Sequence, residues 1–277
     1  MTRCKLTFHE AGSCVHPQHV VLRDWKFSKL RFPAMFAVLE HPTRGVVLYD
    51  TGYSEHFCQE TERWPGRLYG IVTPVELPPQ ASALAHLARR GIGADDVRAI
   101  ICSHFHADHV SALADFPKAR FLCLPDAWRA VCGLRGLRGV LKGFLPGLIP
   151  HDFESRFTPL DPSATRPLPS ECAPFTEGLD LFGDESVYGV PLPGHAAGQL
   201  GLFVPGDERS TLLVADACWT SRSYREQIMP SQVTRLLFDD YGVYGHTLAR
   251  LSELAERSPQ IQIVPSHCDE VLSRLVT

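Results

Sequence analysis

The chain has 277 residues, of which 44% are hydrophobic and 21% are charged, so it can bury a core of ordinary globular size. Its formal net charge of -4 gives no basic footprint for nucleic acid and no strongly acidic tail. No apolar run approaches the roughly 20 residues that cross a bilayer, and the N-terminus lacks the apolar core of a secretion signal. The nine cysteines form no CxxC pair and suit reduced thiols. We therefore expect a cytoplasmic protein without a membrane span or a nucleic-acid partner.

The N-terminal half favours an alternation of strands and helices. Two runs rich in β-branched residues are separated by Pro42 and Gly45, which predicts a hairpin. The expected elements are, in chain order, strands at 35–40 and 45–49, a loop over 54–79, a helix over 81–90, a strand at 97–102, a short helix over 111–116 and a strand at 119–124.

The segment 126–174 differs from its surroundings. Three leucines recur at helical spacing beside a stripe of cations, but four glycines weaken the helix by about 1 kcal/mol each relative to alanine. Residues 154–174 are a proline-rich connection. We expect a helical lid or linker inserted into a single domain spanning residues 1–277; the alternative is an ordinary amphipathic surface element. In a lid, the apolar face would touch substrate and the cations would meet an acidic group, through Leu134, Arg135, Leu137, Arg138, Leu141 and Lys142.

The C-terminal part returns to strands. Two of them are expected to pair across Pro205-Gly206-Asp207. The expected elements are strands at 187–192, 200–204 and 211–215, a helical run over 231–257 and a last strand at 261–265.

The densest cluster of chemically active residues directly follows the strand expected at 97–102. Within six residues the chain places His104, His106, Asp108 and His109 in the pattern HxHxDH. Imidazole nitrogens and carboxylate oxygens suit a divalent transition metal such as zinc. An extended backbone puts His104 and His106 on one face, and a turn then carries Asp108 and His109 toward a second point. The pattern therefore predicts two metal positions; the alternative is a surface loop that happens to be rich in histidine.

Other residues of ligand type also stand where expected strands end. They are His195, Asp216 and His267, while Asp50 ends the strand at 45–49. A lone buried histidine is more often part of a core, and an aspartate at a strand end is often a turn former. Combined with the dense motif, however, these residues predict a single centre that contains both metal positions, in which Asp50 would orient a ligand histidine.

On these motifs the chain resembles the metallo-β-lactamase superfamily of metal-dependent hydrolases. Its layout is most similar to that of the N-acyl homoserine lactone lactonases. The resemblance implies an α/β fold, the αββα sandwich, in which two mixed β-sheets are flanked by helices. The matching stretches are Asp50-Thr51-Gly52, residues 103–109, Pro193-Gly194-His195, Ala215-Asp216-Ala217 and Pro265-Ser266-His267.

The resemblance also implies how the ligands are divided between two divalent ions. Zinc is the expected metal, with manganese, iron and cobalt as alternatives. Asp50 would be the partner that orients a ligand histidine. The implied ligands are His104, His106 and His195 for one ion, Asp108, His109 and His267 for the other, and Asp216 as the bridge between them.

The implied reaction is attack by a metal-bridging hydroxide on a lactone or a related ester bond. Asp108 would pass a proton to the leaving group. The lactonases place a tyrosine shortly after the bridging aspartate, whereas this chain has Trp219, whose indole N–H donates a hydrogen bond but is no phenol acid. This departure weakens the case for homoserine-lactone turnover and quorum quenching. The expected substrate is a small molecule with an acyl chain.

Other functions remain open. One is thioester hydrolysis of the glyoxalase II type, in which Arg135, Arg138 and Lys142 would meet a phosphopantetheine or an acidic carrier protein. The same metal pair would support phosphodiester hydrolysis. A metal-loaded regulatory protein without turnover and a redox role at a single iron are further alternatives. Related lactonases also suggest a homodimer.

Overall fold

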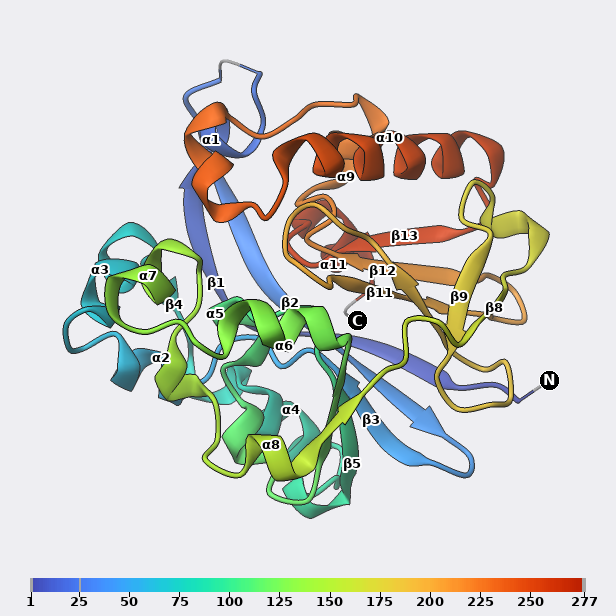
Figure 1. Cartoon of the computed structure of the whole chain (residues 1–277), viewed down its shortest axis with the longest axis horizontal. Helices are drawn as coiled ribbons and strands as arrows, with labels where there is room; N and C mark the ends of the chain where they lie inside the picture. Colours follow the sequence, from blue (N-terminus) through green and yellow to red (C-terminus); the bar gives the residue numbers. More distant parts are fainter. Residues whose placement is uncertain (1, 25, 276–277) are drawn as a thin grey trace.

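Two mixed β-sheets dominate the computed structural model, which describes residues 2–24 and 26–275 (Figure 1). In order of pairing, the first sheet contains β4 (Val75–Glu76), β1 (Lys5–Pro17), β2 (Lys29–His41), β3 (Gly45–Tyr49), β5 (Val97–Ile101), β6 (Arg120–Cys123) and β7 (Phe157–Pro159). The second contains β13 (Gln262–Pro265), β12 (Thr211–Ala215), β11 (Leu200–Val204), β10 (Tyr188–Pro191), β9 (Glu177–Asp180) and β8 (Thr165–Pro167). Both sheets combine parallel and antiparallel pairs. In the first, β3 is parallel to β5 and antiparallel to β2. In the second, β12 is parallel to β13 and antiparallel to β11.

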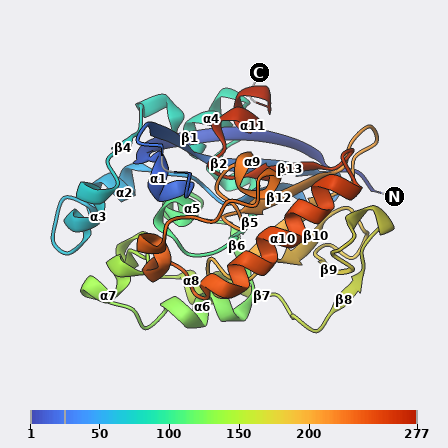
Figure 2. The ribbon, with the colours of Figure 1, turned by 90° about the horizontal axis from the view of Figure 1, so that it is seen from above.

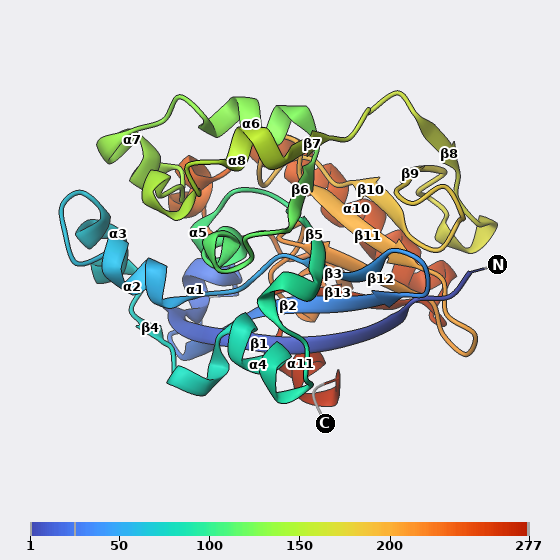
Figure 3. The ribbon, with the colours of Figure 1, turned by 90° about the horizontal axis from the view of Figure 1, so that it is seen from below.

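Helices cover the outer faces of the sheets. The longest, α10 (Tyr241–Arg257), crosses the second sheet, as Figure 2 shows from above. On the first sheet, α4 (Ala83–Arg89) and α11 (Asp269–Leu275) lie beside β1, as Figure 3 shows from below. The others are α1 (Gln18–Val21), α2 (Glu55–Glu60), α3 (Gly66–Val72), α5 (Ala107–Val110), α6 (Pro125–Val131), α7 (Gly136–Leu141), α8 (Phe153–Arg156) and α9 (Ser221–Arg225). None of the helices in the described residues is both long and apolar enough to cross a bilayer.

The core follows from the period-two alternation of the strands. Along β2, Met35 and Ala37 point between the sheets, where they pack in one cluster with Leu213 of β12. The residues between and after them, Phe36 and Val38, point outward and pack under α4. Because both faces of the central strands are buried, their buried stretches, such as residues 32–39 of β2 and 212–215 of β12, are apolar. The structure is therefore the expected sandwich of two sheets between layers of helices.

The predicted hairpins are present. Ala37 of β2 lies opposite Tyr49 of β3, and Leu202 of β11 lies opposite Leu213 of β12, each in an antiparallel pair. These pairings depend on neighbouring segments and short turns, which is why the sequence reveals them.

Three expectations about the elements were wrong. The presumed loop over 54–79 contains α2 and α3, which are stabilised by packing of Phe57 against Tyr53 and Tyr69 rather than by helix propensity. The short helix expected over 111–116 is a single 3₁₀ turn at Leu113–Asp115, after α5. The run over 231–257 divides into a 3₁₀ helix, Gln232–Leu237, and α10, because Asp240 caps the second helix at its N-terminus.

The segment 126–174 is more than an appended helix. Besides α6, α7 and α8 it contributes β7 to the edge of the first sheet and β8 to the edge of the second. The proline-rich connection expected over 154–174 was therefore wrong in part, because it includes these two edge strands. The helices α3 and α7 lie side by side at one end of the sandwich (Figure 1).

Candidate metal centre

The residues of the predicted metal site lie where strands of both sheets end. The HxHxDH stretch follows β5, and Asp50 follows β3 in the first sheet. From the second sheet, β10, β12 and β13 lead into His195, Asp216 and His267. His106 and Asp108 are partly exposed, whereas the buried members are His104, His109, His195, Asp216 and His267.

The structure brings these seven side chains together in two groups. In each group the candidate ligand atoms all lie within 4.8 Å of one another: His104, His106, His195 and Asp216 in one, and Asp108, His109 and His267 in the other.

Asp216 lies between the two groups. Its Oδ2 is 3.2 Å from His195 Nε2, and its Oδ1 is 3.2 Å from His109 Nε2. The same Oδ1 is 3.1 Å from His267 Nε2. The two oxygens of one carboxylate thus face different histidine groups, which is the arrangement that a bridging ligand requires.

Partners outside the cluster fix the orientation of its histidines. Asp50 is fully buried, and its Oδ2 lies 2.7 Å from His109 Nδ1. It also accepts hydrogen bonds of 2.7 Å from the backbone N–H and the hydroxyl of Ser103. His267 Nδ1 donates to the carbonyl of Pro33 at 2.8 Å. With Nδ1 occupied in both rings, each presents Nε2 to the centre of the cluster.

The donor atoms of the cluster fit divalent metal ions. Among the described residues, three buried atoms of the cluster that could bind an ion have no hydrogen-bond partner: His104 Nε2, His109 Nε2 and Asp216 Oδ1. Buried polar atoms are normally paired, because an unpaired one costs about 1–3 kcal/mol. Imidazole nitrogens and a carboxylate oxygen are zinc ligands, so an ion would satisfy these atoms.

Three histidines of the cluster are held in their neutral, ligating form. Burial, reinforced by the neighbouring histidines, keeps the pKa of His104 well below its ordinary value. Burial likewise lowers the pKa of His106 to about 4 and that of His195 well below its usual range, against the pull of Asp216. A neutral imidazole has a free lone pair, which metal binding requires.

The other group, Asp108, His109 and His267, lies in a strongly negative electrostatic environment. Burial disfavours the charged form of His109, but Asp108, Asp50 and Asp216 outweigh it and raise its pKa well above the ordinary value. Burial is outweighed at His267 as well, where Asp216 and Asp108 raise the pKa. Carboxylates that favour protonated histidines also favour a metal cation in the same place.

A cavity of about 280 Å³ opens beside the cluster. Five of the seven predicted ligands line it: His106, Asp108, His195, Asp216 and His267. Much of the remaining wall is apolar and includes Val20, Val21, Phe32, Val72, Val140 and Leu237. A second hollow of about 140 Å³ also reaches His106 and His195 and is lined by Phe105, Val131, Leu134 and Lys142. The centre is thus accessible to a small apolar molecule.

Comparison with known proteins identifies the family. A sequence model described as the metallo-beta-lactamase superfamily matches residues 32–261. The chain belongs to this superfamily. Together with the relatives below, this membership makes the protein a metal-dependent hydrolase.

Relatives of this superfamily member include several lactonases. The chain is 27% identical over 245 residues to the N-acyl homoserine lactonase AiiB of Agrobacterium fabrum, covering 87% of this chain and 81% of the relative. It is 25% identical to the N-acyl homoserine lactonase AttM of Azorhizobium caulinodans, over 96% of this chain and 94% of the relative. A solved N-acyl homoserine lactone hydrolase, with the product N-hexanoyl-L-homoserine at its catalytic metal centre, superposes with a TM-score of 0.72. At 21% identity, covering 99% of this chain and 97% of that one, it shows the shared fold.

The predicted substrate residues of this hydrolase are only partly at the cavities. Leu134 and Lys142 line the second hollow, and Lys142 Nζ donates to the carbonyl of Phe238 at 3.1 Å. Leu137 and Leu141 are 53% and 55% exposed. Arg135 and Arg138 are also exposed, and Arg135 donates to the carbonyl of Leu134. Helical spacing predicts a shared face, but it does not say which face meets the cavity.

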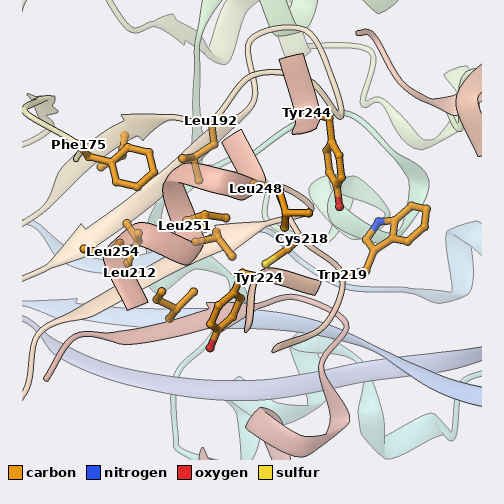
Figure 4. Packing of buried hydrophobic residues seen from close by; sticks show 14 of the residues in the cluster. Phe175, Leu192, Leu212, Cys218, Trp219, Tyr224, Tyr244, Leu248, Leu251 and Leu254 are labelled. Atoms are coloured by element: carbon orange, nitrogen blue, oxygen red, sulfur yellow. The ribbon is translucent and has the colours of Figure 1, made fainter. Parts of the chain in front are cut away.

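Trp219 lines the larger cavity, but its N–H is already engaged. Indole Nε1 donates to Asp216 Oδ2 at 2.9 Å, so Trp219 positions the carboxylate that lies between the two groups. Tyr224 is the nearest phenol in the sequence to the position of the absent tyrosine. It lies in the core under α10, and its hydroxyl points away from Trp219 (Figure 4). Burial raises the pKa of Tyr224 to about 12.

Several residues of the cavity escaped the sequence interpretation. Cys14, His16, Tyr53 and Tyr69 all line the larger cavity. The spacing of Cys14 and His16 by two on a strand is a weak signal that they share a face. Nothing in the sequence around Tyr53, which precedes α2, or Tyr69 of α3 shows that they pack here, because that segment lacks a helical pattern.

Proposed function

We propose that this protein opens a lactone, or a related ester bond of an acyl compound, at a centre of two divalent ions, with zinc as the expected metal. The observation that carries the proposal is the position of Asp216. Its two oxygens face two groups of neutral or carboxylate-paired histidines beside an apolar cavity. In such a centre two ions would lower the pKa of a shared water toward neutrality and polarise the ester carbonyl.

The chain's own residues then have separate tasks. One ion would be held by His104, His106 and His195 and the other by Asp108, His109 and His267, with Asp216 binding both. The side chain of Asp108 is 13% exposed and lines the cavity, so it can accept a proton from the attacking water and deliver it to the leaving oxygen. Asp50 keeps His109 oriented, and Trp219 keeps Asp216 oriented.

The substrate class follows from the cavity and from the relatives. Lactonases related to this chain are named for N-acyl homoserine lactones, and one solved structure binds N-hexanoyl-L-homoserine. An apolar wall of valine, phenylalanine and leucine side chains suits an acyl chain of this kind. A role in quorum quenching and a homodimer remain predictions from the resemblance. A carrier-protein partner remains a prediction of the thioesterase alternative, through Arg135, Arg138 and Lys142.

The test begins with metal quantification on the purified protein. The metal-replete protein is then assayed on N-hexanoyl homoserine lactone, γ-decalactone, a fatty acyl thioester and a phosphodiester. We expect about two ions per chain and turnover of the lactones. Turnover of only the thioester or the phosphodiester would replace the proposal with that activity, and turnover of none would overturn it.

Asp108→Asn tests the assigned proton transfer. We expect kcat/KM to fall roughly 10²- to 10⁴-fold, the usual contribution of general acid–base catalysis. The matched control is Asp115→Asn, because Asp115 also pairs with a histidine, His56 at 2.8 Å, but does not line the cavity. The control should keep its rate within a few-fold. Equal rates for Asp108→Asn and the wild type would refute the role of Asp108.

A further inference from the structure

Three polar side chains form a connected chain on the cavity wall outside the metal cluster. Cys14 and His16 are two residues apart on β1, and Tyr53 lies beside them; all three line the larger cavity. The Tyr53 hydroxyl donates to Cys14 Sγ at 3.9 Å, and Cys14 Sγ lies 3.4 Å from His16 Nε2. The chain of contacts therefore ends on an imidazole at the cavity.

One assignment of donors makes these hydrogen bonds continuous from Tyr53 to His16. Burial, reinforced by Asp108, raises the pKa of Cys14 to about 12, so the thiol keeps its hydrogen. Because Tyr53 donates to the sulfur, we assign the S–H of Cys14 as the donor to His16 Nε2. Burial lowers the pKa of His16, so the ring is neutral and carries one hydrogen. A neutral imidazole that accepts at Nε2 must carry that hydrogen on Nδ1.

His16 is separated from the metal cluster. The ring of Phe32 stacks on His267 at 5.3 Å between centroids, and His16 packs against Phe32 edge-on, also at 5.3 Å. His16 belongs to neither group of candidate ligands. Among the described residues, Cys14 is its hydrogen-bond partner, and that bond uses Nε2. Its Nδ1 therefore has no hydrogen-bond partner among these residues, on a ring that lines the cavity.

We propose that His16 is a substrate-binding residue that donates its Nδ1–H to an oxygen of the substrate distinct from the bond that is cleaved. Cys14 and Tyr53 act as positioning residues that fix the tautomer of the ring. This inference rests on the proposed hydrolase function and narrows its substrate to acyl lactones or esters with a second acceptor oxygen, such as an amide carbonyl. Because the Phe32 ring packs against both His16 and His267, it separates His16 from the candidate metal ligands. His16 would therefore contact a second oxygen of the substrate rather than the oxygen of the reacting bond.

Two lactones from the panel distinguish this role from a merely structural one. N-hexanoyl homoserine lactone has an amide carbonyl besides its ester, whereas γ-decalactone has only the ester. We expect His16→Leu to lower kcat/KM roughly tenfold for the first, mainly through KM, since one neutral hydrogen bond is lost. The rate on γ-decalactone should stay within twofold. An equal loss on both lactones, or no loss on either, would overturn the proposal.

Conservative variants test the position of the donated N–H separately from the stability of the cavity wall. His16→Asn places an amide N–H close to the position of Nδ1 and should recover most of the selectivity, whereas His16→Gln, which reaches toward Nε2, should not. Cys14→Ser keeps a hydroxyl donor and should resemble the wild type, while Cys14→Ala should lose selectivity. If His16→Leu fails to fold, the contrast between His16→Asn and His16→Gln decides the outcome.

Nuclear magnetic resonance of the metal-free protein provides a readout that does not depend on turnover. The ¹⁵N shifts of His16 should show a hydrogen on Nδ1, and titration with N-hexanoyl homoserine lactone should perturb them more than γ-decalactone does. A hydrogen on Nε2, or equal responses to the two lactones, would overturn the role of His16. Absence of hydrolysis by the metal-replete wild type would instead overturn the proposed function.

Discussion

Asp50 adopts a backbone conformation that most side chains avoid. Its φ of +57° lies in the left-handed region, which costs a non-glycine residue about 1–2 kcal/mol. Its carboxylate accepts hydrogen bonds from the backbone and the hydroxyl of Ser103 and lies 2.7 Å from His109 Nδ1. The strained turn after β3 thus places one buried carboxylate where it fixes both the motif backbone and a candidate ligand. From the sequence, Asp50 could equally have been a simple turn former.

The variant Asp50→Asn separates orientation from folding. Asparagine tolerates the left-handed region, but its amide cannot accept from His109 and Ser103 as a carboxylate does. We expect zinc affinity to fall roughly 10- to 100-fold, as is usual when the partner of a ligand histidine is lost. Competition with a chelating dye measures the affinity. The control is Asp184→Asn. The carboxylate of Asp184 pairs with His41 at 3.0 Å outside the cluster, so its loss should not change the zinc affinity. Equal affinities for all three proteins would contradict the role of Asp50.

At the scale of single elements, α7 approaches the metal centre through its backbone. The glycine at its start, Gly136, and the one after its end, Gly143, both have left-handed φ values, +59° and +68°. The carbonyl of Gly143 accepts from the backbone N–H of Ala107, within the HxHxDH motif. A Cβ on Gly143 would lie 2.7 Å from His106 Cδ2, whereas one on Gly136 would meet nothing within 4 Å. The segment predicted as a lid therefore supports a candidate ligand directly.

These two glycines form a matched pair for mutation. Gly143→Ala and Gly136→Ala carry a similar backbone penalty of about 1 kcal/mol. Only Gly143→Ala should displace His106, and we expect it to lower lactone kcat/KM at least tenfold. Gly136→Ala should remain within twofold of the wild type, with a similar loss of thermal stability. Equal activity of the two variants would show that α7 has no influence on His106.

At the scale of the whole molecule, the sequence predicts local features well and distant packing poorly. The HxHxDH motif, the hairpins and the ligand-type residues at strand ends are visible because each depends on a short stretch of chain. The cavity wall is not visible, because β1 meets α3 and the 3₁₀ helix Gln232–Leu237 there only after folding. Exposed Leu137 and Leu141 make the same point, since periodicity does not determine which face is buried.

Removal of metal should weaken the whole molecule. The candidate ligands come from both sheets, so ions would hold the ends of the sandwich together, and ligands that bind only the folded state stabilise it by mass action. At a metal concentration of about 1,000 Kd this contributes about 4 kcal/mol, and chelation should lower Tm by roughly 10 °C. Scanning calorimetry with and without a chelator measures the difference. An unchanged Tm in protein shown to have lost its metal would rule out this coupling.

The candidate ligands and the cavity wall come from different kinds of element, and this has a consequence for evolution. The candidate ligands and Asp50 lie at the ends of buried strands, whereas much of the remaining wall comes from short, partly exposed helices and the outer end of β1. Substitutions at Val72, Thr73, Thr234 or Leu237 can reshape the wall without moving a strand of the sandwich. Substrate preference can therefore drift from one descendant to the next while the hydrolytic centre is inherited intact.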